Sequence, residues 1–205
     1  MTEKQYFHVD QNAIQHLKNR DTRLGKEMER IGRIEREIIP DLFPALVNCI
    51  VGQQISNKAA ATVWNRMQDR FGEITHPMIC IQTEEEIQKC GLTWRKAGQI
   101  KNIATAFLQG EIQLEQLYLL SDDAVIQALV KLPGIGVWTA EMILIFCLQR
   151  PDVLSWGDLA IRRAISVLYA ETNLTKARFN DYKTLFRPYG SVASLYLWQI
   201  AREYT

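Results

Sequence analysis

The sequence predicts an all-α protein. Two observations support this prediction: apolar residues recur at helical spacing along most of the chain, and Ser, Thr or Asp precedes many of these stretches, where it would cap a helix. Alternating strand patterns are hard to find. With 205 residues, of which 47% are hydrophobic and 23% charged, the chain can bury a sizeable core. Disordered and fibrous classes are therefore excluded.

Helical periods and boundary residues place the elements of the first half of the chain. The expected elements are, in order, an amphipathic stretch over 26–38 ended by Pro40, a helix with Asp41 as its N-cap, a helix from Ser56 to Phe71-Gly72, a short helix opened by the capping box at Thr83, and a helix over 94–108 closed by Gly110. The apolar positions of these helices repeat every three or four residues, so each helix has one face for a core.

The second half of the chain is predicted to contain a helical hairpin and three later helices. Its elements are a helix capped by Ser121, a turn over 132–136, an apolar helix over 137–148, a helix opened by Asp158, and two helices around 179–186 and 192–196. The sequence shows neither an internal repeat nor a flexible linker, so a second domain would be formed by the two chain ends packing together.

Charge and hydropathy limit the partners. The 24 Lys and Arg residues against 23 Asp and Glu residues leave a formal net charge of +1, so any surface for an acidic partner must be local. The longest stretch without a charged residue, 42–57, is too short and polar to span a bilayer, and the first ten residues lack the apolar segment of a signal peptide. We therefore expect a cytoplasmic protein without a membrane partner.

Cysteine and glycine motifs exclude several common chemistries. The four cysteines contain no CxxC pair, and with the three histidines they make no spacing typical of a zinc site. The sequence also lacks the phosphate loop of nucleotide-binding proteins, the dinucleotide fingerprint, the esterase elbow and the HExxH metalloprotease pair. We expect the cysteines to be buried, reduced thiols.

The turn at 132–136 reads LPGIG and offers an anion site. Gly134 and Gly136 allow a tight turn that brings backbone N–H groups to the start of the next helix. A phosphate oxygen fits such a place because the helix dipole favours negative charge there, so DNA binding would not require a basic protein. The alternative is an ordinary helix connection whose glycines only satisfy the turn geometry.

The context of this turn resembles the helix-hairpin-helix DNA glycosylases of base-excision repair, in the 3-methyladenine DNA glycosylase II, or AlkA-type, branch. Residues 131–140 read KLPGIGVWTA and 155–160 read SWGDLA, with Asp158 lying 20 positions beyond Trp138. The other blocks of the family are matched by IVGQQIS at 50–56, GLTWRKA at 91–97 and RPYGSVASLYLW at 187–198. The order of the blocks is that of the family.

The resemblance implies the helix-hairpin-helix glycosylase fold, with two helical subdomains and the active-site cleft between them. Residues 41–150 would form one subdomain, which contains the helix-hairpin-helix at about 122–149, and 1–40 with 151–205 would form the other. The implied activity is hydrolysis of the N-glycosidic bond of alkylated purines, of the 3-methyladenine type, flipped out of duplex DNA. The product is an abasic site.

The resemblance also assigns site residues. Asp158 is the implied catalytic carboxylate, although its position alone would fit an ordinary helix cap. Trp138 stands where glycosylases that also cleave the strand carry a Schiff-base lysine, so we expect no lyase activity. The implied base pocket adds Trp198 and Met142. The implied DNA-binding residues are Gly134, Ile135, Gly136, Thr139, Gln53, Gln54, Arg95 and Lys96.

The expected partner is double-stranded DNA with damaged bases, and the protein is expected to act as a monomer. We expect no cofactor and no iron–sulfur cluster, because the last cysteine is Cys147, whereas the resemblance allows a monovalent cation at the hairpin carbonyls. Two other functions stay open: a glycosylase for deaminated bases, and a non-catalytic helix-hairpin-helix protein that binds DNA or senses lesions. A binder would need the hairpin but not Asp158 and Trp138. A helical bundle that binds a small ligand would not account for the spacing of these two residues.

Overall fold

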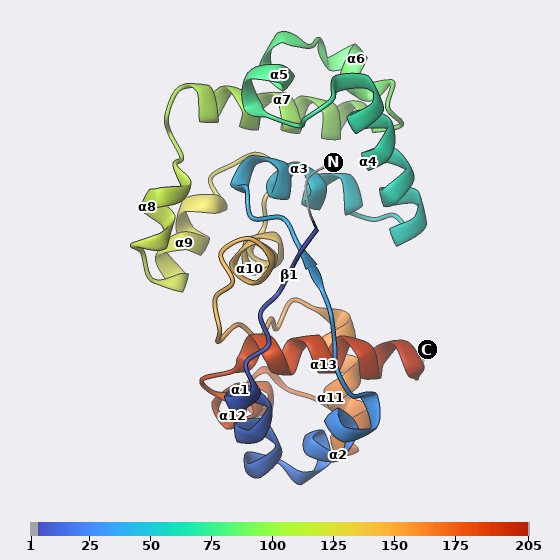
Figure 1. The fold of residues 1–205 in the computed structure, drawn as a ribbon, viewed down its shortest axis with the longest axis vertical. Coiled ribbons are helices and arrows are strands. Elements are labelled where there is room, and N and C mark those ends of the chain that lie inside the picture. Colours follow the sequence, from blue (N-terminus) through green and yellow to red (C-terminus); the bar gives the residue numbers. More distant parts are fainter. Residues whose placement is uncertain (1–3, 205) are drawn as a thin grey trace. The chain divides into compact units, whose positions relative to one another are not determined.

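The structure, a computed structural model, describes residues 4–204, and in that range it contains thirteen helices and one two-stranded antiparallel sheet (Figure 1). The chain divides into two units. One, here the terminal unit, is the chain up to Ile38 together with Gln149 onward, and the other, the central unit, is Ile39–Leu148. No helix within 4–204 has the length and hydropathy needed to cross a membrane.

The terminal unit is built from elements of both chain ends. Its elements are β1 Gln5–Tyr6, α1 Gln11–Arg20, α2 Thr22–Ile31, β2 Glu37–Ile38, α11 Leu159–Tyr169, α12 Lys176–Phe186 and α13 Gly190–Glu203. The last helix, red in Figure 1, packs against α11, α2, α12 and α1. Most of α13 is buried because its small and apolar residues, from Gly190 to Leu197, face neighbours on several sides. Helix α13 is therefore the core element of this unit.

The central unit contains the remaining helices. Its elements are α3 Leu42–Gly52, α4 Asn57–Phe71, α5 His76–Ile81, α6 Glu84–Gln88, α7 Trp94–Leu108, α8 Leu114–Tyr118, α9 Asp122–Leu129 and α10 Val137–Phe146. Helix α3 packs against α4, α7 and α10, and α10 packs against α9. The side chains of Leu46, Val47, Ile50, Ile100 and Ile145 have no exposed surface. Their burial makes α3 the centre of the core.

Four predicted caps are confirmed, whereas Asp41 stands at the N-cap position of α3 without a side-chain hydrogen bond to the helix. The side chains of Ser56, Thr83, Ser121 and Asp158 accept hydrogen bonds from backbone N–H groups in the first turns of α4, α6, α9 and α11. The helix predicted over 94–108 has those bounds. Each cap contributes about 1 kcal/mol by satisfying a donor that the helix itself leaves unpaired.

The prediction of one amphipathic stretch over 26–38 is wrong. Helix α2 ends at Ile31, because Gly32 takes a left-handed φ of 74° that stops the helix. Glu37 and Ile38 then pair with Tyr6 and Gln5 as β2. The charge pattern gave no sign of this pairing, since the partner strand lies more than 30 residues earlier in the chain.

Three helices had no counterpart in the sequence prediction, and two of them are very short. Helix α1 has ten residues, whereas α5 has six and α8 has five, which is too few for a helical period to be visible. The caps still mark two of them, because Asp10 caps α1 and Thr75 caps α5.

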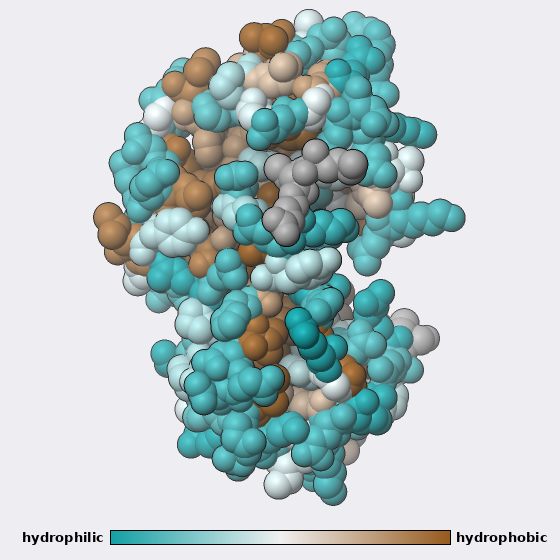
Figure 2. Space-filling view, in the orientation of Figure 1, coloured by the Kyte–Doolittle hydropathy of each residue, from teal (hydrophilic) through white to brown (hydrophobic). Residues whose placement is uncertain are grey.

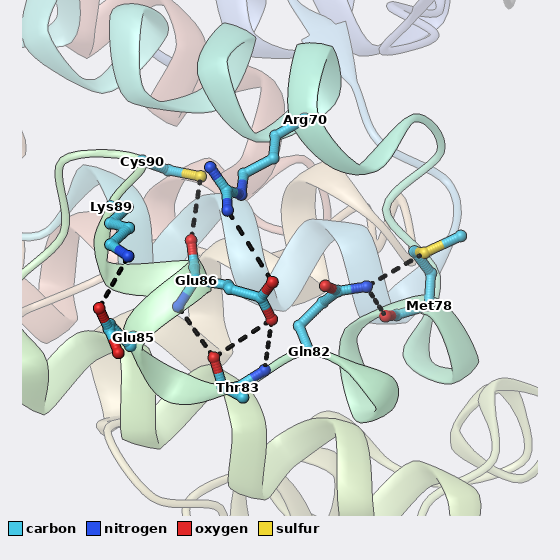
Figure 3. Close-up of polar contacts among 8 residues, drawn as sticks. All are labelled: Arg70, Met78, Gln82, Thr83, Glu85, Glu86, Lys89 and Cys90. Atoms are coloured by element: carbon cyan, nitrogen blue, oxygen red, sulfur yellow. Dashed lines mark hydrogen bonds and ion pairs between the residues drawn. The ribbon is translucent and has the colours of Figure 1, made fainter.

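A polar network around the capping box fixes the segment between α4 and α7 (Figure 3). The Glu86 carboxylate accepts from the Thr83 backbone N–H at 3.0 Å, and Thr83 Oγ1 in turn accepts from the Glu86 N–H at 3.2 Å. Arg70 of α4 lies 3.9 Å from the same carboxylate. These contacts lower the pKa of Glu86, the largest cause being the backbone hydrogen bond from Thr83.

The surface of the two units is largely hydrophilic in the view of Figure 2, with apolar residues gathered over α8 and α9. Leu119, which follows α8, has 88% of its surface exposed. The large apolar side chains of α3 are buried instead, so the apolar surface over α8 is a local feature.

Candidate active site

Asp158 is held by two hydrogen bonds at the start of α11. Its Oδ1 accepts from the Ile161 backbone N–H at 2.9 Å, and its Oδ2 accepts from the Trp198 indole Nε1–H at 3.1 Å. Only 7% of Asp158 is exposed. Because each carboxylate oxygen accepts a hydrogen bond, the plane of the carboxylate is fixed. The structure therefore brings together two of the predicted site residues, Asp158 and Trp198, within the terminal unit.

The segment that precedes Asp158 is fastened to α13 by two serines whose role the sequence did not reveal. Ser191 Oγ accepts from the Val153 N–H at 3.0 Å and donates to the Arg150 carbonyl at 2.5 Å. Ser194 Oγ donates to the Val153 carbonyl at 2.8 Å. Both serines are fully buried. Hydroxyls in an otherwise apolar helix were the available signal, since a buried polar group needs a partner.

These bonds determine where Trp198 lies relative to Asp158. Helix α13 carries Ser191, Ser194 and Trp198, and the first two anchor the chain five to eight residues before Asp158. Gly190 permits a close approach, because a Cβ there would lie 3.0 Å from Asp152 Oδ1 and 3.2 Å from the Asp152 backbone carbon. A register shift of α13 would therefore separate the indole from the carboxylate.

Trp156, just before Asp158, is packed rather than open. Its ring meets Phe179 edge to face with centroids 5.2 Å apart, and the Arg162 guanidinium lies 4.8 Å from the ring centroid. Arg162 stands one turn after Asp158 on α11. The cation and the two rings thus stiffen the turn that presents the carboxylate.

The hairpin in the central unit uses its two glycines differently. Gly134 has φ of 84°, and a Cβ there would lie 2.5 Å from Gln99 Cδ. Gly136 has an ordinary φ of −97°, is the N-cap of α10, and would present a Cβ to open space. Gly134 is therefore needed for the turn itself, whereas Gly136 leaves the helix start without a side chain in the way.

Helix α10 displays Trp138 and buries the next residues. Trp138 lies in its first turn with 40% of its surface exposed, whereas Thr139 and Met142 have 3% and 5% exposed. Ile135 in the turn is buried as well, at 5%. Of the residues predicted on this helix and turn, Trp138 is thus the one with a large exposed side chain.

Gln53 and Lys96 contact protein backbone within the central unit. Gln53 Nε2 donates to the Gly134 carbonyl at 3.0 Å, and Lys96 Nζ donates to the carbonyls of Val51 at 2.9 Å and Gln53 at 2.7 Å. Burial lowers the pKa of Lys96. Gln54 and Arg95 are exposed. The structure thus joins Gln53, Lys96 and the hairpin, which the sequence had placed in three separate motifs.

Burial affects the thiols of the central unit, and residues 4–204 contain no ligand set for a metal centre. Burial raises the pKa of Cys49 and of Cys147 to about 12. No three His, Cys, Asp or Glu side chains within the described range lie together as metal ligands. The hairpin carbonyl of Gly134 accepts the Gln53 amide, and a monovalent cation at the hairpin stays a prediction.

Two helical units, a glycine hairpin and a carboxylate fixed at a helix start define the architecture of a helix-hairpin-helix glycosylase. Residues 47–188 match the family model of the HhH-GPD superfamily of base excision DNA repair proteins. The match spans more than half of the chain. The chain therefore belongs to this superfamily.

Two relatives support this membership. The chain is 32% identical over 170 residues to DNA-3-methyladenine glycosylase 1 of Schizosaccharomyces pombe, covering 80% of this chain and 75% of that protein. It is 27% identical over 175 residues to a DNA-3-methyladenine glycosylase of Bacillus subtilis, covering 79% of this chain and 58% of that protein. This chain therefore spans under two thirds of the length of the Bacillus subtilis relative.

Solved structures share the fold. The crystal structure of a DNA-3-methyladenine glycosidase from Bacillus halodurans matches with a TM-score of 0.83 and 30% identity over 98% of this chain and 94% of that one. The Schizosaccharomyces pombe 3-methyladenine DNA glycosylase in complex with abasic DNA matches with a TM-score of 0.81 and 29% identity, over 92% and 95%. The predicted fold class is thereby confirmed.

Proposed function

We propose that this chain is a DNA glycosylase of base-excision repair that hydrolyses the N-glycosidic bond of alkylated purines, 3-methyladenine among them, and leaves an abasic site. The observation that carries the proposal is the Asp158 carboxylate, buried at the start of α11 and oriented by Ile161 and Trp198 in a chain of this superfamily. A protein that only binds DNA would not need a carboxylate held in this way.

The reaction begins with extrusion of the damaged nucleotide, because the bond between sugar and base is inaccessible in the stacked duplex. As that bond breaks, its electron pair leaves with the base and positive charge develops on the sugar. Asp158 stabilises this charge and takes a proton from the water whose oxygen bonds to the sugar carbon. A single carboxylate suffices since an alkylated purine is already a good leaving group.

Trp138 supplies selectivity in this proposal. Its side chain is 40% exposed on α10, and its indole would meet the extruded base. A cationic alkylpurine gains attraction to an indole face that a neutral base gains less of, by up to about 2 kcal/mol in a desolvated site. Met142, one turn later on the same helix, is 5% exposed.

The same residue accounts for the expected absence of strand cleavage. A lyase step needs an amine that forms a Schiff base with the sugar, and an indole nitrogen cannot do so. The enzyme is therefore monofunctional in our proposal, and the strand stays intact at the abasic site.

The DNA backbone is held at the α10 start. Gly136 presents no side chain to obstruct a phosphate there, and the helix dipole favours the anion. Exposed Arg95 adds a cation in the same unit. This grip is independent of sequence, as a repair enzyme requires.

The first test is release of free base from methylated duplex DNA by the wild type and by Asp158→Asn. We expect base release by the wild type alone, with strand breaks that appear only after alkali. Equal release by the variant would refute the role of Asp158, and breaks without alkali would refute monofunctional chemistry. Release only from deaminated DNA would move the substrate class to hypoxanthine or uracil, and DNA binding without any release would favour a non-catalytic protein.

A further inference from the structure

The side chain of Lys96, a residue of α7, contacts the C-terminal end of another helix, α3. Lys96 belongs to the first turn of α7, and its ammonium donates to the Val51 and Gln53 carbonyls at 2.9 and 2.7 Å. These carbonyls are at the C-terminal end of α3, where a helix leaves its last carbonyls without intrahelical partners and where a cation is favoured. Lys96 thus ties α7 to the end of α3.

Gln53 carries this connection on to the hairpin. Its backbone carbonyl accepts from Lys96, and its side-chain Nε2 donates to the Gly134 carbonyl at 3.0 Å. We call Lys96, Gln53 and the Gly134 carbonyl the Lys96 latch. It joins α7, the α3–α4 loop and the hairpin, three segments that are far apart in the sequence.

The residue that follows the latch has an unusual backbone. Gln54 has φ of 58°, a left-handed conformation that costs a residue other than glycine free energy. Its side chain is exposed. Such a conformation persists only where neighbouring contacts enforce it, and the latch supplies contacts to the residue directly before it.

The resemblance to the glycosylases implies that the loop of Gln53 and Gln54 enters the DNA and fills the gap left by the extruded nucleotide. We propose that Lys96 and Gln53 are positioning residues that hold this loop in the shape needed for that step. The proposal rests on the proposed glycosylase function. Two of the three N–H donors of the Lys96 ammonium go to protein carbonyls, so its main partner is the loop rather than a DNA phosphate. Neighbouring Arg95 is exposed and is the cation that faces solvent.

The effect of the latch on the rate of base release should therefore increase with the free energy needed to extrude the nucleotide. A base paired in the duplex must be unpaired and unstacked, whereas a base opposite an abasic position has already lost its pairing partner. Loss of the latch should slow base release from the paired lesion much more than from the unpaired one. A general loss of folding would slow both equally.

The experiment compares single-turnover base release from duplexes that carry one 7-methylguanine, placed either opposite cytosine or opposite an abasic position. We expect Lys96→Met to slow release about tenfold or more from the paired lesion and under about threefold from the unpaired one. A 2-aminopurine beside the lesion should show less unstacking with the variant. Lys96→Arg, which keeps donors and charge, should restore part of the rate.

Lys101→Met is the matched control. Lys101 also lies on α7 and donates to two carbonyls at the end of a helix, that of Cys80 in the last turn of α5 and that of Gln82 directly after it. That segment contains no predicted DNA-binding residue. We expect the ratio of paired to unpaired rates to stay at the wild-type value for this variant.

The outcomes separate the latch from the proposed function. Equal slowing of both substrates by Lys96→Met, or no slowing of either, overturns the latch while the glycosylase stands. A wild type that releases no base overturns both. If Lys96→Met fails to fold, Gln53→Met, which removes only the bond to the hairpin, must show the same selective slowing to a smaller degree, and an unchanged ratio overturns the latch.

Discussion

Helices α10 and α11 begin in opposite ways. The N-cap of α10 is Gly136, which has no side chain to cap the helix. The N-cap of α11 is Asp158, whose carboxylate accepts the Ile161 N–H at 2.9 Å. Every helix start favours negative charge. One of these starts is left open to an anion from outside, and the other already holds an anion of the protein.

The difference shows how the same backbone property serves two purposes. At α10 the residue without a side chain permits a phosphate to approach, so the backbone itself is the binding group in our proposal. At α11 the helix start fixes a side chain, and Trp198 fixes its second oxygen. In our proposal, DNA binding needs an accessible backbone at the start of α10, whereas catalysis needs an oriented carboxylate at the start of α11.

The largest expected effect comes from separating capping from catalysis at α11. Serine caps helices about as well as aspartate, so Asp158→Ser should keep the cap of α11 and lower the free energy of unfolding by no more than about 1–3 kcal/mol, the cost of removing the carboxylate oxygen that accepts from Trp198. It should slow base release about a thousandfold or more, because the charge that stabilises the sugar is lost. Single-turnover base release and denaturant unfolding measure the two effects. If the variant retained wild-type activity, Asp158 would be only a cap.

A smaller effect is expected from the second hydrogen bond. Trp198→Phe keeps an aromatic ring but removes the N–H that Asp158 Oδ2 accepts at 3.1 Å. A hydrogen bond to a charged group contributes about 1.5–3 kcal/mol, so the rate of base release should fall about tenfold to a hundredfold. DNA affinity, measured by fluorescence anisotropy, should change little. A loss of affinity without a loss of rate would instead assign Trp198 to the base pocket alone.

The smallest expected effects distinguish the two hairpin glycines. Gly134→Ala should destabilise the fold by about 1–2 kcal/mol, because its φ of 84° is unfavourable for alanine. Gly136→Ala should leave the stability within about 0.5 kcal/mol, since the new methyl group meets no neighbour, but should weaken binding to all DNA sequences alike. Thermal unfolding and anisotropy with two unrelated duplexes check this. The opposite pattern would contradict the phosphate site at α10.

Local features could be predicted from the sequence because their causes lie within a few residues. Ser56, Thr83 and Ser121 cap helices through bonds that span three residues. The stretch over 26–38 failed for the complementary reason, since β2 exists only through its pairing with β1. Periodicity within a segment carries no information about a partner strand elsewhere.

The sequence by itself determined the helical class, most of the caps, and the motifs that place Asp158 and Trp138 in a superfamily of DNA repair proteins. Only the tertiary structure decided which atoms these motifs bring together. The Trp198 N–H donates to Asp158, and Ser191 and Ser194 bond to the segment that precedes Asp158. Lys96 bonds to the Gln53 carbonyl, and the Gln53 side chain bonds to the hairpin. The physical reason is range. A cap is satisfied within one turn, whereas these bonds join residues about 40 or more positions apart, and their direction is set by the packing of whole helices.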